Sequence, residues 1–188
     1  MSRNTAQILN ELLVLRAQDG DESALAELFR DWQNRLVVYA QDLLSDREAA
    51  QDVVHESWLA ILKGIRKLDD PARFKSWAYR IVHHKAMDVL RRRVKNRQVT
   101  QNSIVEEPAV PRESNEVSDV SQQLRIAIAK LKPTDRTLVR LFYIDNVPQK
   151  DICEIVGISL SALKSRLFQV RNKLRKFIER ENHESRQY

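Results

Sequence analysis

The chain has 188 residues, of which 43 % are hydrophobic and 31 % charged, so it can bury a core and remain soluble. Its three glycines and five prolines, with no alternating Val/Ile/Thr run between turn dipeptides, exclude an extensive sheet and predict an all-α fold. One cysteine, Cys153, excludes an intrachain disulfide, and no window is apolar enough to span a membrane. The formal net charge of +6 suits a polyanionic partner such as nucleic acid or an anionic membrane surface.

The first half of the sequence predicts four helices. The first covers about residues 5–18, and Asp21 is expected to cap the second. A Ser-x-x-Glu box at Ser45–Glu48 is expected to open the third. Pro71 ends the third helix, and the fourth runs from about Ala72 to Lys95. The side chains expected to point inward from the third helix are Val53, Val54, Leu59, Leu62 and Ile65.

The composition changes at residues 99–120, which hold two prolines and five carboxylates but one arginine and no helical apolar stripe. Such a segment cannot bury enough apolar surface to order itself, so a flexible acidic linker is expected. The chain is therefore predicted to form two small helical domains, residues 1–97 and 121–182, joined by residues 98–120. In a chain joined in this way, the basic surfaces of both domains are expected to lie open.

The second half predicts shorter helices that end in a helix-turn-helix. One helix precedes Pro133, a second runs from Pro133 to Tyr143, and a third begins at Pro148. This third helix stops at Gly157, and Ser159 is expected to cap the last one. One stripe of that last helix is expected to be core, and it consists of Leu163, Leu167, Val170, Leu174 and Phe177.

The outer faces of the last helix are strongly basic, with seven cations and one carboxylate between Leu160 and Arg180. A solvated amphipathic helix is one interpretation. The preceding helix and its glycine-containing turn favour the other, a recognition helix in the major groove of DNA. The candidate DNA-binding residues are Ser161, Lys164, Ser165, Arg166, Gln169 and Arg171.

A second basic stretch, Phe74–Arg97, combines aromatic residues with eight cations and one carboxylate. Rings beside a cationic track suit unstacked single-stranded bases, although aromatic residues at this spacing are mostly core. Trp77 and Tyr79 cannot both share one buried stripe with Ile81, so at least one of them is expected to be partly exposed. The adjacent His83 and His84 face different ways on a helix, which argues against a joint metal site.

A polar face on the third helix carries Asp52, His55 and Glu56. The two carboxylates are four residues apart, a spacing that slightly destabilises an isolated helix. An ordinary surface face and a docking site for a basic partner both remain open.

Four stretches resemble a bacterial RNA polymerase sigma factor of the extracytoplasmic-function group, in the sigma-70 family. They begin "GDESALAELF", "AAQDVVHESW", "FKSWAYRIVH" and "LKPTDRTLVR", and they occur in the order of the family. The resemblance implies a sigma region 2 helical bundle before the linker and a sigma region 4 helix-turn-helix after it.

The resemblance also implies roles. Asp52, His55 and Glu56 match the segment that docks on the clamp helices of the polymerase β′ subunit, and region 4 is expected to contact the β flap. The last helix matches the part that enters the −35 major groove. The residues that match the element that melts and binds −10 DNA, as duplex and then as single strand, include Trp77, Tyr79, Arg80, His84, Lys85, Arg91 and Arg92.

The function predicted from these features is that of a cytoplasmic transcription initiation factor with no active site and no cofactor. Its expected partners are RNA polymerase core, promoter DNA and an anti-sigma factor, without membrane insertion. One alternative is a stand-alone helix-turn-helix regulator, which leaves the carboxylate face and the aromatic-basic helix without a role. A catalytic protein is a further alternative, but no acid/base pair, nucleophile–histidine set or phosphate-binding glycine loop supports it.

Overall fold

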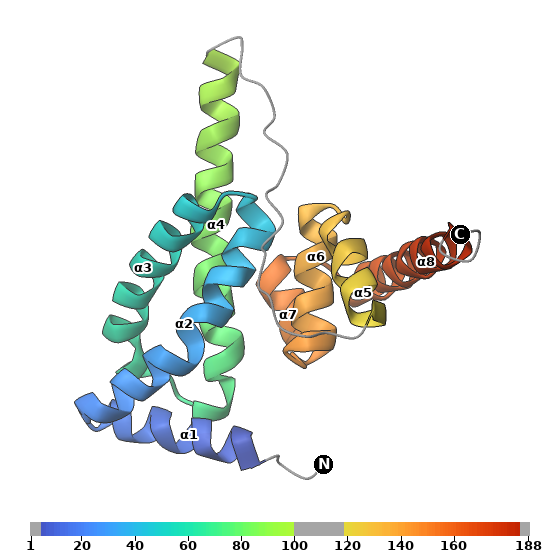
Figure 1. Ribbon diagram of the computed structural model, residues 1–188. Helices are drawn as coiled ribbons and strands as arrows, with labels where there is room; N and C mark the ends of the chain where they lie inside the picture. The colour runs from blue at the N-terminus through green and yellow to red at the C-terminus, as the bar shows by residue number, and fades with distance from the viewer. Residues whose placement is uncertain (1–4, 100–118, 185–188) are drawn as a thin grey trace.

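The computed structural model describes residues 5–99 and 119–184, and every regular element in these ranges is helical (Figure 1). This confirms the all-α prediction. Most of the predicted linker lies outside the described residues. None of the helices in the described ranges is long and apolar enough to cross a membrane.

The first four helices form an N-terminal bundle, residues 5–99, in which α2 packs against the other three. The four are α1 (Thr5–Gln18), α2 (Glu22–Leu44), α3 (Arg47–Gly64) and α4 (Phe74–Val99). Asp21 caps α2 as predicted, because its carboxylate accepts hydrogen bonds from the backbone N–H groups of Ser23 and Ala24. Short 3-10 turns at Ile65–Lys67 and Pro71–Arg73 connect α3 to α4.

Aromatic rings on α2 and α4 form the centre of this bundle. Trp32 meets Phe74 edge to face with ring centroids 5.5 Å apart, and Tyr39 meets Tyr79 at 4.9 Å. Phe74, Tyr39 and Tyr79 are completely buried. These contacts fix which face of α4 points inward, because aromatic pairs favour such tilted geometries and bury large apolar areas.

Two expectations for α3 are wrong. Ser45 does not open α3 but ends α2 in the left-handed region at φ 52°, and Asp46 caps α3 by accepting from the N–H of Ala49. That backbone hydrogen bond, together with Arg93, holds the pKa of Asp46 below its usual value. Leu59 and Leu62 point outward and are about half exposed, because α3 turns Val53, Val54 and Ile61 towards α2 and α4 instead.

The C-terminal unit, residues 119–184, surrounds a smaller core of Leu131, Val139 and Val170. A π-helical turn at Arg140–Ile144 extends α6, so the helix predicted from Pro133 to about Tyr143 is present with a local widening. The helices of this unit are α5 (Asp119–Ala129), α6 (Pro133–Val139), α7 (Gln149–Val156) and α8 (Leu160–Glu184).

The two units are packed against each other, with α6 beside α2 and α7 beside α4 (Figure 1). Leu138, Leu141 and Ile152 of the C-terminal unit are fully buried and join the core of the N-terminal bundle. The two units therefore share a buried boundary, while Arg80, His84 and Arg91 of α4 and the outer face of α8 are exposed. The short helices α6 and α7 carry apolar residues on a second face, and this face packs against α2 and α4.

One buried polar pair predicts how stability depends on pH. His83 Nδ1 lies 2.9 Å from the hydroxyl of Tyr39, and burial, together with the neighbouring His84, lowers the pKa of His83 from 6.5 to about 4. Between these pH values the unfolded chain binds a proton at this position that the folded chain does not. The free energy of unfolding should therefore fall as the pH falls from 6.5 to 4, by about 3 kcal/mol from this group.

Urea unfolding at a series of pH values measures this slope. His83→Gln should make the slope shallower over the same interval, whereas His55→Gln, at an exposed position, is the matched control. An unchanged slope in His83→Gln would assign the acid sensitivity to other groups.

Candidate nucleic-acid interface

The turn between α7 and α8 has the geometry of a helix-turn-helix. Gly157 ends α7 in the left-handed region at φ 70°, where its N–H donates to the carbonyl of Cys153 at 2.9 Å. Ser159 accepts a hydrogen bond from the N–H of Ala162 in the first turn of α8. Both residues act as predicted. Ile152 and Ile155 are buried at the corner where the two helices meet.

The outer face of α8 is available to a partner. All six predicted DNA-binding side chains of this helix are exposed, and they are Ser161, Lys164, Ser165, Arg166, Gln169 and Arg171. The predicted inner stripe is confirmed, since Leu163, Leu167 and Val170 are buried and Leu174 and Phe177 are half-buried. In Figure 1, α8 extends away from the N-terminal bundle, with its whole length on the far side of α6 and α7.

The two aromatic candidates of α4 differ. Trp77 is half-buried, which confirms that at least one of the pair is partly exposed. Tyr79 is fully buried between the rings of Trp32 and Tyr39, so it cannot stack on a base in this arrangement, and we assign it to the core. Burial and the nearby carboxylate of Asp145 raise the pKa of Tyr79.

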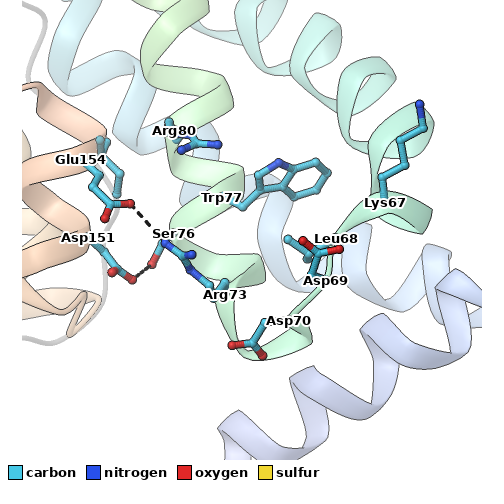
Figure 2. Close-up of a pocket in the computed structure, with 11 residues that line it drawn as sticks. Lys67, Leu68, Asp69, Asp70, Arg73, Ser76, Trp77, Arg80, Asp151 and Glu154 are labelled. Atoms are coloured by element: carbon cyan, nitrogen blue, oxygen red, sulfur yellow. Dashed lines mark hydrogen bonds and ion pairs between the residues drawn. The ribbon is translucent and has the colours of Figure 1, made fainter.

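Trp77 lies in a pocket of about 280 Å³ between the two units (Figure 2). Its indole packs on the end of α3, where a Cβ added to Gly64 would lie only 2.8 Å from Trp77 Cζ2. Arg80 is exposed and lines the same pocket. The pocket therefore combines a ring face with a cation, the groups that bind a single-stranded base and its phosphate.

Sequence analysis missed most of the other residues that line this pocket. They come from the connection between α3 and α4 and from α7, and they include Lys67, Asp69, Asp70, Arg73, Ser76, Asp151 and Glu154. The sequence signal that could have indicated these residues is the polar stretch before Pro71, which separates the third and fourth helices close to Trp77. The contribution of α7 had no local signal.

A second groove, of about 310 Å³, runs between α3 and α4. Asp52 and Glu56 line it from α3, and Lys85 and Arg92 line it from α4. Lys85 Nζ lies 3.1 Å from Glu56 Oε2, so a residue predicted to bind −10 DNA is paired with one predicted to bind polymerase.

The remaining predicted side chains of α4 are exposed. His84 and Arg91 lie on the same helical face as Arg80, whereas His83 is buried, so the two histidines face different ways as predicted. Arg91 Nη2 is 2.5 Å from Asp88 Oδ1 within the helix. On α3, His55 is exposed but does not line the groove. The geometry therefore separates a groove in which carboxylates of α3 face cations of α4 from the exposed face of Arg80, His84 and Arg91.

These features define a two-part helical protein whose C-terminal unit is built to bind duplex DNA. Comparison with known families matches residues 28–96 to sigma-70 region 2 and residues 121–174 to sigma-70 region 4. The first match covers the groove and Trp77, and the second covers the helix-turn-helix.

Curated relatives extend over most of the chain. The ECF RNA polymerase sigma factor SigW of Bacillus subtilis is 23 % identical over 174 residues, which cover 87 % of this chain and 93 % of SigW. The ECF RNA polymerase sigma-E factor of Haemophilus influenzae is 26 % identical over 178 residues, or 88 % of this chain and 93 % of the relative.

Solved structures share the fold. The sigma factor RpoE of Bartonella quintana, in complex with the anti-sigma factor NepR, matches with a TM-score of 0.69 and 19 % identity, covering 82 % of this chain and 96 % of RpoE. CnrH, in complex with the cytosolic domain of CnrY, matches with a TM-score of 0.60 and 20 % identity over 91 % of this chain and 97 % of CnrH.

The chain belongs to the sigma-70 family, as an RNA polymerase sigma factor of the extracytoplasmic-function group. Its function is therefore that of a promoter-specific transcription initiation factor. A stand-alone regulator is not favoured, because such a protein needs no region 2 bundle.

The close approach of Gly64 to Trp77 generates a prediction. Gly64→Ala should displace the indole, because the added Cβ would overlap ring atoms. The indole N–H resonance of Trp77, assigned with Trp77→Phe, should shift more than those of Trp32 and Trp58 in a nitrogen–proton spectrum. Lys63→Ala, at the neighbouring exposed position, should leave all three in place. Equal small shifts in both variants would show that the pocket accommodates a methyl group.

Proposed function

We propose that the N-terminal bundle docks on RNA polymerase core through the carboxylates of α3 that line its groove with α4. Asp52 and Glu56 present their carboxylates beside an opening that a basic or amphipathic helix could enter. Their match to the segment that contacts the β′ clamp helices in this family supports this choice, and His55 would flank the contact. In this structure Glu56 is paired with Lys85, so docking would replace this ion pair by one between Glu56 and a basic residue of the polymerase.

For DNA, we propose a division between the two units. Lys164, Ser165 and Arg166 would bind the −35 duplex, because they are exposed near the start of a recognition helix. Trp77 and Arg80 would bind the separated −10 strand by stacking and by phosphate contact, with His84 and Arg91 along the same face. Lys85 and Arg92 lie in the groove, and we assign them to the polymerase side of the bundle.

The observation that carries this proposal is the presence of both surfaces in one chain. A duplex-binding helix-turn-helix alone would suit many regulators, whereas exposed carboxylates on α3 and a half-buried tryptophan beside exposed cations on α4 suit a polymerase subunit. We propose that the chain acts in the cytoplasm, supplies recognition, and leaves the chemistry to the polymerase. Contact of the C-terminal unit with the β flap and control by an anti-sigma factor are part of the proposal, the latter supported by the RpoE–NepR relative.

Charge reversal tests the docking groove. Asp52→Lys with Glu56→Lys should keep the helical circular dichroism, because lysine is a good helix former. Its affinity for purified core should fall at least about tenfold, or ~1.4 kcal/mol, because two favourable charges become repulsive. Fluorescence anisotropy of labelled protein titrated with core measures this change.

A matched control carries the same change in net charge elsewhere on the bundle. Asp19 and Asp31 are exposed outside the groove, and Asp19→Lys with Asp31→Lys should bind core like the unmodified chain. If Asp52→Lys with Glu56→Lys binds core with full affinity, the docking site lies elsewhere. Absence of any complex with the unmodified chain would return the stand-alone regulator to consideration.

Two variants test the division between DNA surfaces. Lys164→Ala with Arg166→Ala should weaken capture of a duplex promoter by holoenzyme, at about 1–3 kcal/mol for each lost specific contact. Binding of the same holoenzyme to a pre-melted −10 fragment should change little. Trp77→Ala should do the reverse, because stacking on a single-stranded base is worth about 1–3 kcal/mol.

The promoter for these assays can be selected by the holoenzyme from genomic fragments. Lys150→Ala with Lys176→Ala removes two exposed cations from the same unit away from the start of α8 and is the matched control. A thermal melt must accompany Trp77→Ala, since its ring also packs on Gly64. If the α8 variant impaired the pre-melted fragment as much as the duplex, one continuous DNA surface would replace the division.

A further inference from the structure

The two units meet along a boundary that we call the domain seam. The N-terminal bundle contributes five residues to it, namely Asp42, Ser45, Arg73, Lys75 and Ser76. The C-terminal unit also contributes five, namely Arg136, Arg140, Asp145, Asp151 and Glu154. Along α2 the C-terminal unit supplies cations, and along α4 it supplies acceptors.

The contact at α2 is largely shielded from solvent. Arg140 Nε donates to Asp42 Oδ2 at 2.6 Å, and the two side chains are only 19 % and 17 % exposed. Arg136 Nη2 donates to the backbone carbonyl of Asp42 at 3.2 Å and to the hydroxyl of Ser45 at 2.9 Å. The last carbonyls of a helix are unpaired and carry partial negative charge, so a guanidinium is favoured there.

The contact at α4 has the opposite polarity (Figure 2). Ser76 Oγ donates to Asp151 Oδ2, and Arg73 Nη2 donates to Glu154 Oε2 at 3.2 Å. The Arg73–Glu154 pair is exposed and contributes little by itself. Lys75 Nζ donates to the carbonyl of Asp145 at 2.8 Å, and burial lowers the pKa of Lys75. Acceptors from the C-terminal unit therefore surround the first turn of α4, whose N–H groups favour anions.

The carboxylates of α7 occupy the wall of the pocket that holds Trp77 and Arg80. Asp151 and Glu154 accept hydrogen bonds from Ser76 and Arg73 at the start of α4, and they line the same pocket as Arg80 (Figure 2). A phosphate brought beside them would meet like charges a few ångströms away. The outer face of α8, in contrast, stays exposed in this arrangement.

The seam is imperfectly satisfied, which suits a contact that opens. Among the described residues, Arg136 Nε is buried at the seam without a hydrogen-bond partner, and the buried Tyr79 hydroxyl of α4 faces the carboxylate of Asp145. A buried polar atom without a partner destabilises the contact that buries it, and separation of the units would return Arg136 Nε to water.

We propose that the C-terminal unit is an intramolecular competitor of the −10 strand, with Asp151 and Glu154 in the place of DNA phosphates and the Asp42–Arg140 pair holding the units together. This inference rests on the proposed function of Trp77 and Arg80. The free chain then binds duplex DNA through α8 but excludes single-stranded DNA from the pocket until the seam opens.

A charge swap tests the seam without touching either DNA surface. Donor and acceptor dyes on Glu48→Cys and Lys150→Cys, in a Cys153→Ala background, report the distance between the units by energy transfer. Asp42→Arg should lower the transfer efficiency of the free chain, and Asp42→Arg with Arg140→Asp should restore it. Asp31→Arg makes the same charge change at an exposed position of α2 and should have no effect. Unchanged transfer in Asp42→Arg, with the fold intact by circular dichroism, would overturn the proposed seam.

A binding assay tests the competition. The probe is a fluorescein-labelled single-stranded oligonucleotide of mixed sequence, titrated with the free chain. Asp42→Arg, and separately Asp151→Asn with Glu154→Gln, should each bind it more tightly by at least about fivefold, the lower end of usual coupling between sites. The charge-swapped double variant should bind like the unmodified chain.

The outcomes separate this inference from the proposed function. If Asp42→Arg separates the units but does not increase the affinity for the oligonucleotide, the proposed competition is overturned. Trp77→Ala in the opened Asp42→Arg background should abolish the gain, and a retained gain would place the single strand outside the pocket and overturn the competition as well. If holoenzyme with Trp77→Ala binds the pre-melted −10 fragment as tightly as the unmodified holoenzyme, the proposed −10 role of Trp77 is contradicted instead.

Discussion

The packing of α4 against α2 through buried aromatic rings is the constraint on which the rest of the structure depends. Tyr79 is held against Tyr39 and Trp32, so the rotation of α4 about its axis is fixed. Each residue of a helix is rotated by about 100° from the one before it, so the inward orientation of Tyr79 determines where every other residue of α4 points. Trp77 and Arg80 then open towards the pocket, and Lys85 and Arg92 turn towards α3.

One helix therefore forms part of the core, the groove between α3 and α4, the pocket and the seam. A variant that repacks the aromatic rings would alter all four together, so loss of polymerase binding alone does not identify a docking residue. The opposite polarity of the two seam contacts follows from helix direction as well. The C-terminal unit meets the carboxyl end of α2 with arginines and the amino end of α4 with carboxylates, which matches the partial charges at both ends.

Local features of the fold were predictable from sequence, whereas contacts between distant residues were not. Asp21, Gly157 and Ser159 act within their own turns, so neighbouring residues suffice to predict them. The Ser-x-x-Glu box at Ser45 misled because Asp46, one residue later, is an equally good cap, and only the geometry of the turn chooses between them.

The candidate site could likewise be predicted only where it depends on residues close together in the sequence. The exposed face of α8 follows from helical periodicity and is present as expected. Tyr79 and Trp77 are two residues apart in an aromatic stretch, and their separation into core and pocket depends on rings from α2 that periodicity along α4 does not contain. The partners of Asp151 and Arg140 lie 75 and 98 residues away, so no local pattern could indicate the seam.

The left-handed backbone of Ser45 has a consequence for how the two units depend on each other. Glycine would adopt this φ of 52° with less strain, yet the hydroxyl that glycine lacks is the acceptor for Arg136. A residue that is locally unfavourable for the bundle is thus favourable for the assembled chain. Replacement of Ser45 by glycine would therefore relieve strain at the end of α2 and at the same time remove one contact between the units.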